Sequence, residues 1–223
     1  MSPELRDVFD EVPAGHGPIG LLSSDEFLGV AEPFDRALQA VTGTRIALIF
    51  AADPRGAARS ARLATSYYKR LGRDPVVVDV LIRDDARADA LPDYDVLFLA
   101  GGSPAALVAC LRDTPLWEEA LRRWRSGAAL AGSSAGAMAL CRHTLVPEPG
   151  DRRPSTWTTG CGPVEKVALA VHARTAPPAW LEHVRATAPV PVIALDEGVG
   201  VLLTPGAEPV VAGDGRAWLL EGA

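Results

Sequence analysis

The sequence predicts a single α/β domain with three layers, in which helices cover both faces of a mostly parallel central sheet. Apolar, β-rich runs alternate with helical patterns along most of the 223 residues, which is the order expected of such a sheet. The runs are continuously apolar, as is typical of strands buried on both faces. There is no internal repeat and no long linker. We therefore expect an N-terminal lead-in at residues 1–16 and one domain at residues 17–223.

The expected strands and helices follow from these runs and from their flanking residues. We expect strands at residues 18–22, 45–51, 75–81, 96–100, 128–131, 166–171, 190–195, 200–203 and 208–211. We expect helices at residues 57–71, 103–112 and 179–185, and another after Thr114. Thr114 can cap that helix, Pro115 suits its first position and Gly127 ends it. A polar, proline-rich stretch after Pro147, up to Thr159, is expected to be irregular.

Charge and composition limit the classes of function. The chain has 22 Lys and Arg against 28 Asp and Glu, a formal net charge of −6 that argues against a nucleic-acid partner. Its three cysteines are far apart in sequence, without the spacing of a zinc site, and an odd number suits a reducing compartment. No apolar run resembles a signal peptide or a membrane span. We therefore expect a soluble cytoplasmic protein without a membrane partner.

A candidate nucleophile lies where one predicted strand meets a helix. Residues 132–136 read Gly-x-Ser-x-Gly around Ser134, and small residues on both sides allow the sharp turn that exposes a nucleophilic serine. The N–H of Ala135 would then point to where an oxyanion develops. Gly102, which follows another strand, can bring a second N–H close to a substrate. The alternative is a small-residue turn that only packs a helix against a strand.

A serine nucleophile needs a base, and the chain has four histidines. His16 lies in the glycine-rich lead-in, and His143 follows the helix that begins after Ser134, facing away from its N-terminus. His183 lies within a predicted helix, where we expect it to be solvated. His172 ends a predicted strand at the same edge of the sheet as the other loops, so we expect it to be the base.

The order of the candidates along the chain argues against an α/β-hydrolase. In that fold the serine is followed by the acid and then by the histidine. Here the best-placed acids, Asp196 and Glu197, come after the last histidine. Asp151 would restore the hydrolase order, but it lies in a polar stretch with no strand before it.

Three segments together resemble the dipeptidase E and cyanophycinase family of serine peptidases. They are residues 131–137 (AGSSAGA), 100–104 (AGGSP) and 194–198 (ALDEG), and the resemblance extends from Gly17 to the C-terminus. It implies a fold like that of class I glutamine amidotransferases, which is flavodoxin-like, with serine in place of cysteine at the turn.

The resemblance also implies roles for individual residues. Ser134 matches the nucleophile, His172 the base and Glu197 the acid, while Gly102 and Ala135 match the oxyanion donors. No metal or organic cofactor is implied. The expected activity is hydrolysis of a small, acidic or other, peptide through an acyl-enzyme.

Two positions depart from the family pattern. Ser103 replaces the amide or acid that often follows the glycine pair, and Arg174 is the one arginine near His172 before Arg185. Ser103 and Arg174 are therefore candidate substrate-binding residues, and both departures argue against cyanophycin or Asp-Xaa dipeptides as substrates.

Two other functions stay open at this point. One is a catalytically silent, ligand-binding relative with the same fold, although such a protein has no need of Ser134, His172 and Glu197 together. The other is an amidotransferase-like subunit, which is disfavoured because serine replaces cysteine at the turn and Cys141 lies a helix away. The expected partner is a small peptide or amide substrate, and a homo-oligomer is left open.

Overall fold

The computed structural model describes residues 5, 8–9, 11–147 and 155–220, and it confirms the predicted three-layer α/β class. The strands of the central sheet are β1 (Ile19–Leu22), β2 (Arg45–Ile49), β3 (Asp74–Val77), β4 (Val96–Leu99), β5 (Ala129–Ser133), β10 (Gly200–Leu203) and β11 (Val210–Ala212). They are arranged in the order β11-β10-β1-β5-β4-β2-β3. Five neighbours, from β1 to β3, are parallel, whereas β10 and β11 add an antiparallel edge beyond β1. The carboxyl ends of β1, β5 and β4 therefore meet at one edge of the sheet.

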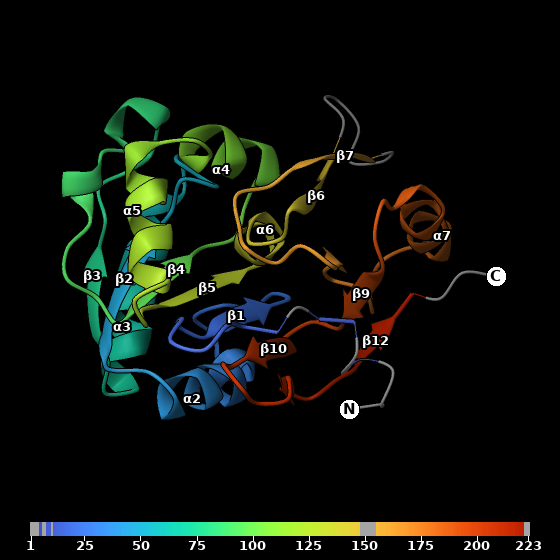
Figure 1. Cartoon of the computed structure of the whole chain (residues 1–223), viewed down its shortest axis with the longest axis horizontal. Coiled ribbons are helices and arrows are strands. Elements are labelled where there is room, and N and C mark those ends of the chain that lie inside the picture. Colours follow the sequence, from blue (N-terminus) through green and yellow to red (C-terminus); the bar gives the residue numbers. More distant parts are fainter. Residues whose placement is uncertain (1–4, 6–7, 10, 148–154, 221–223) are drawn as a thin grey trace.

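Helices cover both faces of this sheet. They are α2 (Glu32–Ala40), α3 (Ala57–Arg70), α4 (Pro104–Leu111), α5 (Pro115–Trp124) and α6 (Ala135–Ala139), with short 3-10 turns η1 (Gly29–Ala31), η2 (Arg83–Asp85) and η3 (Ala88–Ala90). Strand residues alternate between the faces, so Phe98 packs with α2 and α3 while Leu97 and Leu99 pack with α4, α5 and α6. In Figure 1, β3 lies at one end of the molecule and α7 (Pro178–Thr187) at the other.

A second, smaller sheet stands beside the central one. It has the order β12-β9-β8, formed by β8 (Ala168–Ala170), β9 (Val192–Leu195) and β12 (Ala217–Leu219). β8 and β9 are parallel, so their carboxyl ends also lie together. Both were predicted as strands, but their place in a separate sheet was not, because apolar runs do not specify their partners.

The stretch after Pro147 that was expected to be irregular ends in a strand, β7 (Ser155–Thr159), which forms a hairpin with the residues before it, so that expectation was wrong for residues 155–159. β6 (His143–Pro147) pairs antiparallel with β7, and the tip between them, including Asp151, lies outside the described residues. Threonines and a tryptophan favour a strand here, and cross-strand pairing outweighs the prolines.

The N-terminal lead-in contributes to the core through three buried side chains, those of Leu5, Phe9 and Val12. None of the helices in the described part of the chain combines the length and the apolar character needed to span a bilayer.

A buried carboxyl group joins α2 to α3 beneath the loop that follows β1. Tyr67 and Tyr68 donate hydrogen bonds of 2.8 and 3.1 Å to the carboxyl oxygens of Asp35. Both tyrosine rings also contact Phe27, which is 5% exposed and packs against Phe98. The aromatic cluster therefore anchors the residues around position 27 to the face of the sheet.

We expect Asp35 to make the stability of the fold depend on pH. Burial raises the pKa of Asp35 to about 6, against the lowering effect of the two tyrosine hydrogen bonds. Between about pH 4 and pH 6, Asp35 is therefore still protonated in the folded state, whereas it has already released its proton in the unfolded state. The free energy of unfolding should fall with rising pH across this window, by about 3 kcal/mol, and then stay level.

Urea unfolding of the wild type and of Asp35→Asn between pH 4 and pH 7 tests this expectation. The variant should lose this part of the pH dependence, whereas the exposed control Asp214→Asn should keep it. Parallel pH profiles for wild type and Asp35→Asn would contradict the assignment.

Candidate active site

Ser134 lies at the carboxyl end of β5, in a backbone conformation that side chains rarely adopt. Its φ is 50° and its ψ is −114°. The turn is tied at both ends, because the N–H of Ser134 donates to the carbonyl of Leu22 (3.0 Å) and its carbonyl accepts from Met138 (2.9 Å). Strained residues of this kind persist only where their surroundings hold them, and they cluster at functional sites.

Two glycines make this turn possible. A Cβ atom on Gly132 would lie 2.5 Å from the carbonyl carbon of Gly136, and one on Gly136 would lie 2.0 Å from the carbonyl oxygen of Leu99. Both contacts are with backbone, which cannot move aside. The Gly-x-Ser-x-Gly spacing therefore lets α6 pack directly on the ends of β4 and β5.

His172 lies beside Ser134, as the sequence predicted. The Oγ of Ser134 and the Nε2 of His172 are 3.1 Å apart, within hydrogen-bond distance. His172 also has a positive φ, of 56°. The backbone N–H of His172 donates a hydrogen bond to the Oγ of Ser23 (3.0 Å). The hydroxyl of Ser23 in turn donates to the carbonyl of Leu195 (3.0 Å). Ser23 thus links the end of β1 to the loops after β8 and β9, and sequence reasoning had given it no such role.

Glu197 does not make the expected contact with the far nitrogen of His172. Its carboxylate accepts hydrogen bonds from the Oγ1 of Thr175 (2.5 Å) and from the Nε of Arg174 (3.2 Å). Thr175 lies within 3.4 Å of the carbonyl oxygen of His172, so Glu197 reaches the histidine through the loop that carries it. In the described part of the chain, no side chain is hydrogen-bonded to the Nδ1 of His172.

The surroundings of Glu197 keep it ionised. Burial alone would raise its pKa, but the hydrogen bond from Thr175, a backbone hydrogen bond and the charge of Arg174 together lower the pKa below its ordinary value. This group therefore stabilises the loop at neutral pH, and its contribution is lost only as the pH falls through its lowered pKa.

Asp196, the neighbouring acid, is directed elsewhere. Its Oδ2 accepts a hydrogen bond from the N–H of Arg216 (2.9 Å), so it closes the turn towards β12. Asp151, the other alternative, lies outside the described residues.

The glycine pair after β4 lies next to the nucleophile. Gly102 has a φ of 142°, and a Cβ atom there would lie 2.5 Å from the carbonyl oxygen of Ala52, so this position requires glycine. Gly102 and Ser134 line the same cavity. Ala135 is the first residue of α6, where a backbone N–H has no acceptor within its helix.

Glu26 holds the turn and the glycine loop together, and nothing in the sequence indicated this. Its Oε1 accepts a hydrogen bond from the N–H of Gly101 (2.9 Å), and its Oε2 accepts one from the Oγ of Ser133 (2.7 Å). Asp25 and Phe27, on either side, have positive φ values of 61° and 66°. The strained loop thus places one carboxylate where it fixes two separate segments of the site.

Ser103 and Arg174, the two candidate substrate contacts, are engaged with the protein. The Oγ of Ser103 accepts from the N–H of Ala106 (3.2 Å) and caps α4. Arg174 is paired with Glu197. Neither residue lines the cavity at Ser134.

The other histidines lie apart from Ser134. His16 stacks edge-on against Trp124, and His143 begins β6. His183 was expected to be solvated, but it is half-buried and its Nε2 lies 3.2 Å from the carbonyl oxygen of Ser155. Strand β7 covers it, and that strand was not predicted.

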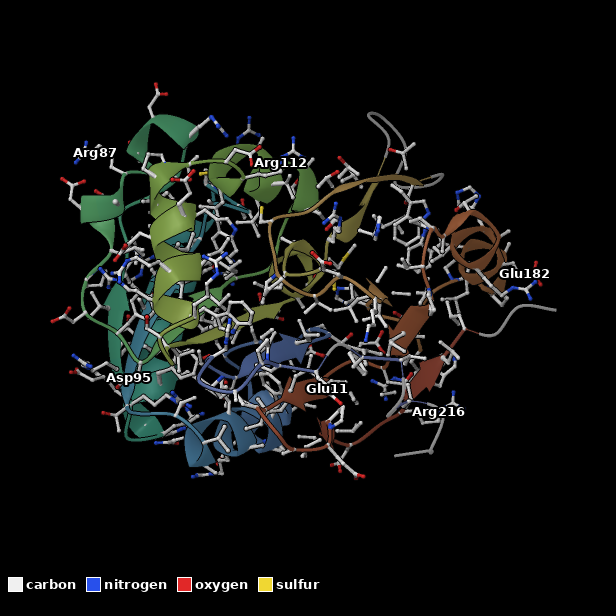
Figure 2. The ribbon with its side chains drawn as sticks, in the orientation of Figure 1. Glu11, Arg87, Asp95, Arg112, Glu182 and Arg216 are labelled. Carbon is white, nitrogen blue, oxygen red and sulfur yellow. The ribbon has the colours of Figure 1, made fainter. Side chains whose placement is uncertain are left out.

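A cavity of about 360 Å³ opens beside Ser134 and His172. A larger hollow of about 750 Å³ lies at the opposite edge of the sheet, where Arg45 is paired with Asp95. Figure 2 labels Asp95 at the far side of the molecule from α7. Ser134 and His172, the candidate catalytic residues, line the smaller cavity. In the described ranges, no three His, Cys, Asp or Glu side chains cluster closely enough to hold a metal ion.

The fold and the paired Ser134 and His172 define a class, that of α/β proteins with a nucleophilic turn at the carboxyl edge of a parallel sheet. The model of peptidase family S51 matches residues 21–207, and the chain belongs to this family, that of dipeptidase E and cyanophycinase. It is accordingly a serine peptidase by family. A search of curated protein sequences gave no match.

Two solved structures are similar to the chain. One is a peptidase from an acI-B1 Actinobacterium, with a TM-score of 0.80 and 26% identity over 99% of this chain and 94% of that one. The other is described as a peptidase E protein from Listeria monocytogenes EGD-e, with a TM-score of 0.65 and 14% identity over 89% of this chain and 99% of that one. The second likeness supports the fold alone.

The glycines of the turn should be required for folding. Gly136→Ala forces a Cβ atom against the backbone of Leu99, so we expect a loss of about 3 kcal/mol or more in the free energy of unfolding. Gly29→Ala is the matched control, because a Cβ there meets nothing within 4 Å and the change should stay below about 1 kcal/mol. Urea unfolding measures both, and equal effects would contradict the packing argument.

Proposed function

We propose that the chain hydrolyses small peptides, with Ser134 as nucleophile and His172 as general base. The observation that carries this proposal is the 3.1 Å approach of the Ser134 Oγ to the His172 Nε2 at the wall of a cavity. A cavity of about 360 Å³ lies at the lower end of the range of small-molecule sites, which is roughly 300–1,000 Å³, and so favours a short peptide over a long polymer.

The proposed reaction proceeds in two acyl-transfer steps. The Oγ of Ser134 attacks the scissile carbonyl carbon as its proton passes to the Nε2 of His172. The C–N bond then breaks, and His172 returns this proton to the leaving amine. A water molecule, deprotonated by His172, then attacks the ester carbonyl. His172 returns this proton to the Oγ of Ser134 as the ester bond breaks, and the acid is released. Water and the side chains of the protein suffice for these steps.

Two backbone N–H groups would stabilise the oxyanion. The donors are Ala135, which follows the nucleophile, and Gly102, whose backbone lies beside Ser134. Glu26 supports this arrangement, because it holds the N–H of the preceding Gly101 and the hydroxyl of Ser133. Donors that are already oriented stabilise developing charge without reorganising during the reaction.

Glu197 would act as a positioning residue for His172. Its carboxylate holds Thr175, three residues after the histidine, and thereby fixes the loop that carries the imidazole.

A catalytically silent, ligand-binding relative is the second candidate. The observation in its favour is that Glu197 bonds Thr175 and Arg174 instead of the imidazole. The strained turn at Ser134 argues for the hydrolase, because a binding protein gains nothing from a strained serine that is presented to a histidine.

A fluorophosphonate probe separates these two functions. The wild type should be labelled on Ser134, Ser134→Ala should not be labelled, and His172→Asn should be labelled far more slowly. Peptide hydrolysis should fall by roughly four or more orders of magnitude in Ser134→Ala.

Mass spectrometry of the labelled peptide identifies the site. Ser66→Ala is the control, because this exposed serine on α3 bonds only the helix backbone. A folded wild type that stays unlabelled would support the silent relative.

The role of Glu197 predicts that its effect passes through Thr175. Glu197→Gln and Thr175→Val should each lower kcat by about 10- to 100-fold, because the imidazole loses its position. The double variant should be little worse than either single one. Steady-state kinetics of the four proteins measures this coupling, and fully additive losses would instead show that Glu197 acts on His172 independently of Thr175.

A further inference from the structure

The cavity beside Ser134 has a mostly apolar wall. Apart from the reacting residues, its described lining includes Met138 from α6, Leu145 from β6, Val171 before the histidine and Trp180 from α7. Pro104, Ala176, Gly102, Ser155 and Thr175 complete it. His172 is thus the only lining residue among the described ones that can carry a charge.

Among the described residues, an ion pair lies in the loop that follows His172, outside this wall. Arg174 is 60% exposed and lies 3.2 Å from Glu197, whose side chain is 12% exposed. The arginine that a substrate carboxylate would need is therefore already paired with a carboxylate of the protein. In the described wall, an acidic substrate side chain would lose its hydration without gaining a cation.

The wall is also held in place by hydrogen bonds. Trp180 donates from its Nε1 to the Oγ of Ser155 (3.5 Å), and His183 lies 3.2 Å from the carbonyl oxygen of Ser155. Trp157 donates to the Oγ1 of Thr187 (3.0 Å). These contacts join the hairpin to α7, so the apolar surface exists before a ligand enters.

We propose that this cavity is a specificity pocket for a large apolar side chain next to the scissile bond, so that the substrates are short peptides with residues such as Leu or Phe. The inference rests on the proposed function and adds to it the class of substrate. The occupant follows from the position of the pocket, because Ser134 and His172 form part of its wall and only a group bonded to the reacting carbonyl or amine reaches it.

The preference should be measurable. Hydrophobic pockets distinguish side chains of different size by roughly 10- to 200-fold, since burial of apolar surface contributes to binding in the transition state. We expect kcat/KM for Leu or Phe to exceed that for Ala by at least roughly tenfold at one of the two positions next to the scissile bond, and Asp to be cut more slowly than Ala.

Two series of dipeptides test this expectation on the full chain. One varies the first residue and the other the second, through Ala, Leu, Phe, Lys and Asp, with release of free amino acids measured by chromatography. Labelling of Ser134 by a fluorophosphonate probe runs in parallel and reports the nucleophile independently of the peptide.

A matched pair of variants tests the wall itself. Ala176→Arg places a cation in the pocket and should lower the ratio of Leu to Asp hydrolysis by roughly tenfold or more. Ala179→Arg adds the same charge at an exposed position of α7 that does not line the pocket, and it should leave the ratio unchanged.

The outcomes separate the two proposals. A preference for Leu or Phe that Ala176→Arg reduces and Ala179→Arg does not would support the pocket. Retained labelling of Ser134 with equal or faster cleavage of Asp peptides would overturn the pocket and leave the hydrolase in place. A folded wild type that is neither labelled on Ser134 nor able to hydrolyse any of the peptides would overturn the proposed function, and this inference with it.

Discussion

The site depends on one steric constraint, the absence of side chains at Gly132 and Gly136. Only because these positions carry no Cβ atoms can β5 turn into α6 within a single residue and hold Ser134 at a φ of 50°. The strain at Ser134 is offset by the backbone hydrogen bonds on either side and by the fully buried packing of α6 against β4 and β5. Everything else at the site is arranged around the hydroxyl that this turn exposes.

The histidine comes from a different sheet, so its position relies on connections between the two sheets. Ser23 accepts a hydrogen bond from the backbone N–H of His172 and donates one to the carbonyl of Leu195, and so joins the end of β1 to the ends of β8 and β9 in the smaller sheet. Thr175 and Glu197 make a second connection between the loops after β8 and β9. Several individually weak hydrogen bonds at the carboxyl ends of parallel strands thus keep the Oγ of Ser134 and the Nε2 of His172 at a distance of 3.1 Å.

Most of the fold was predictable because its signals are local. The apolar runs around β1, β2, β4 and β5, and the capping of α5 by Thr114, need no tertiary information to be recognised. The hairpin β6–β7 was missed because its strands are polar and gain their order from pairing with each other and from hydrogen bonds to α7. The prediction that His183 is solvated was wrong for the same reason, because Ser155 of the unpredicted strand β7 lies against its side chain.

The sequence by itself determined the turn at Ser134 and the glycine beside it, because both follow from short-range geometry at the end of a strand. It also singled out His172 among four histidines by its place after a predicted strand, but only the contacts between the two sheets bring this histidine to Ser134. Only the tertiary structure decided which groups the carboxylates of Glu26 and Glu197 bind. Glu26, distant in sequence from Gly101 and Ser133, bridges them, while Glu197 holds Thr175 and Arg174 instead of the imidazole. A carboxylate has no local pattern that reveals its partner, since its hydrogen bonds depend on which loops the fold brings within about 3 Å of it.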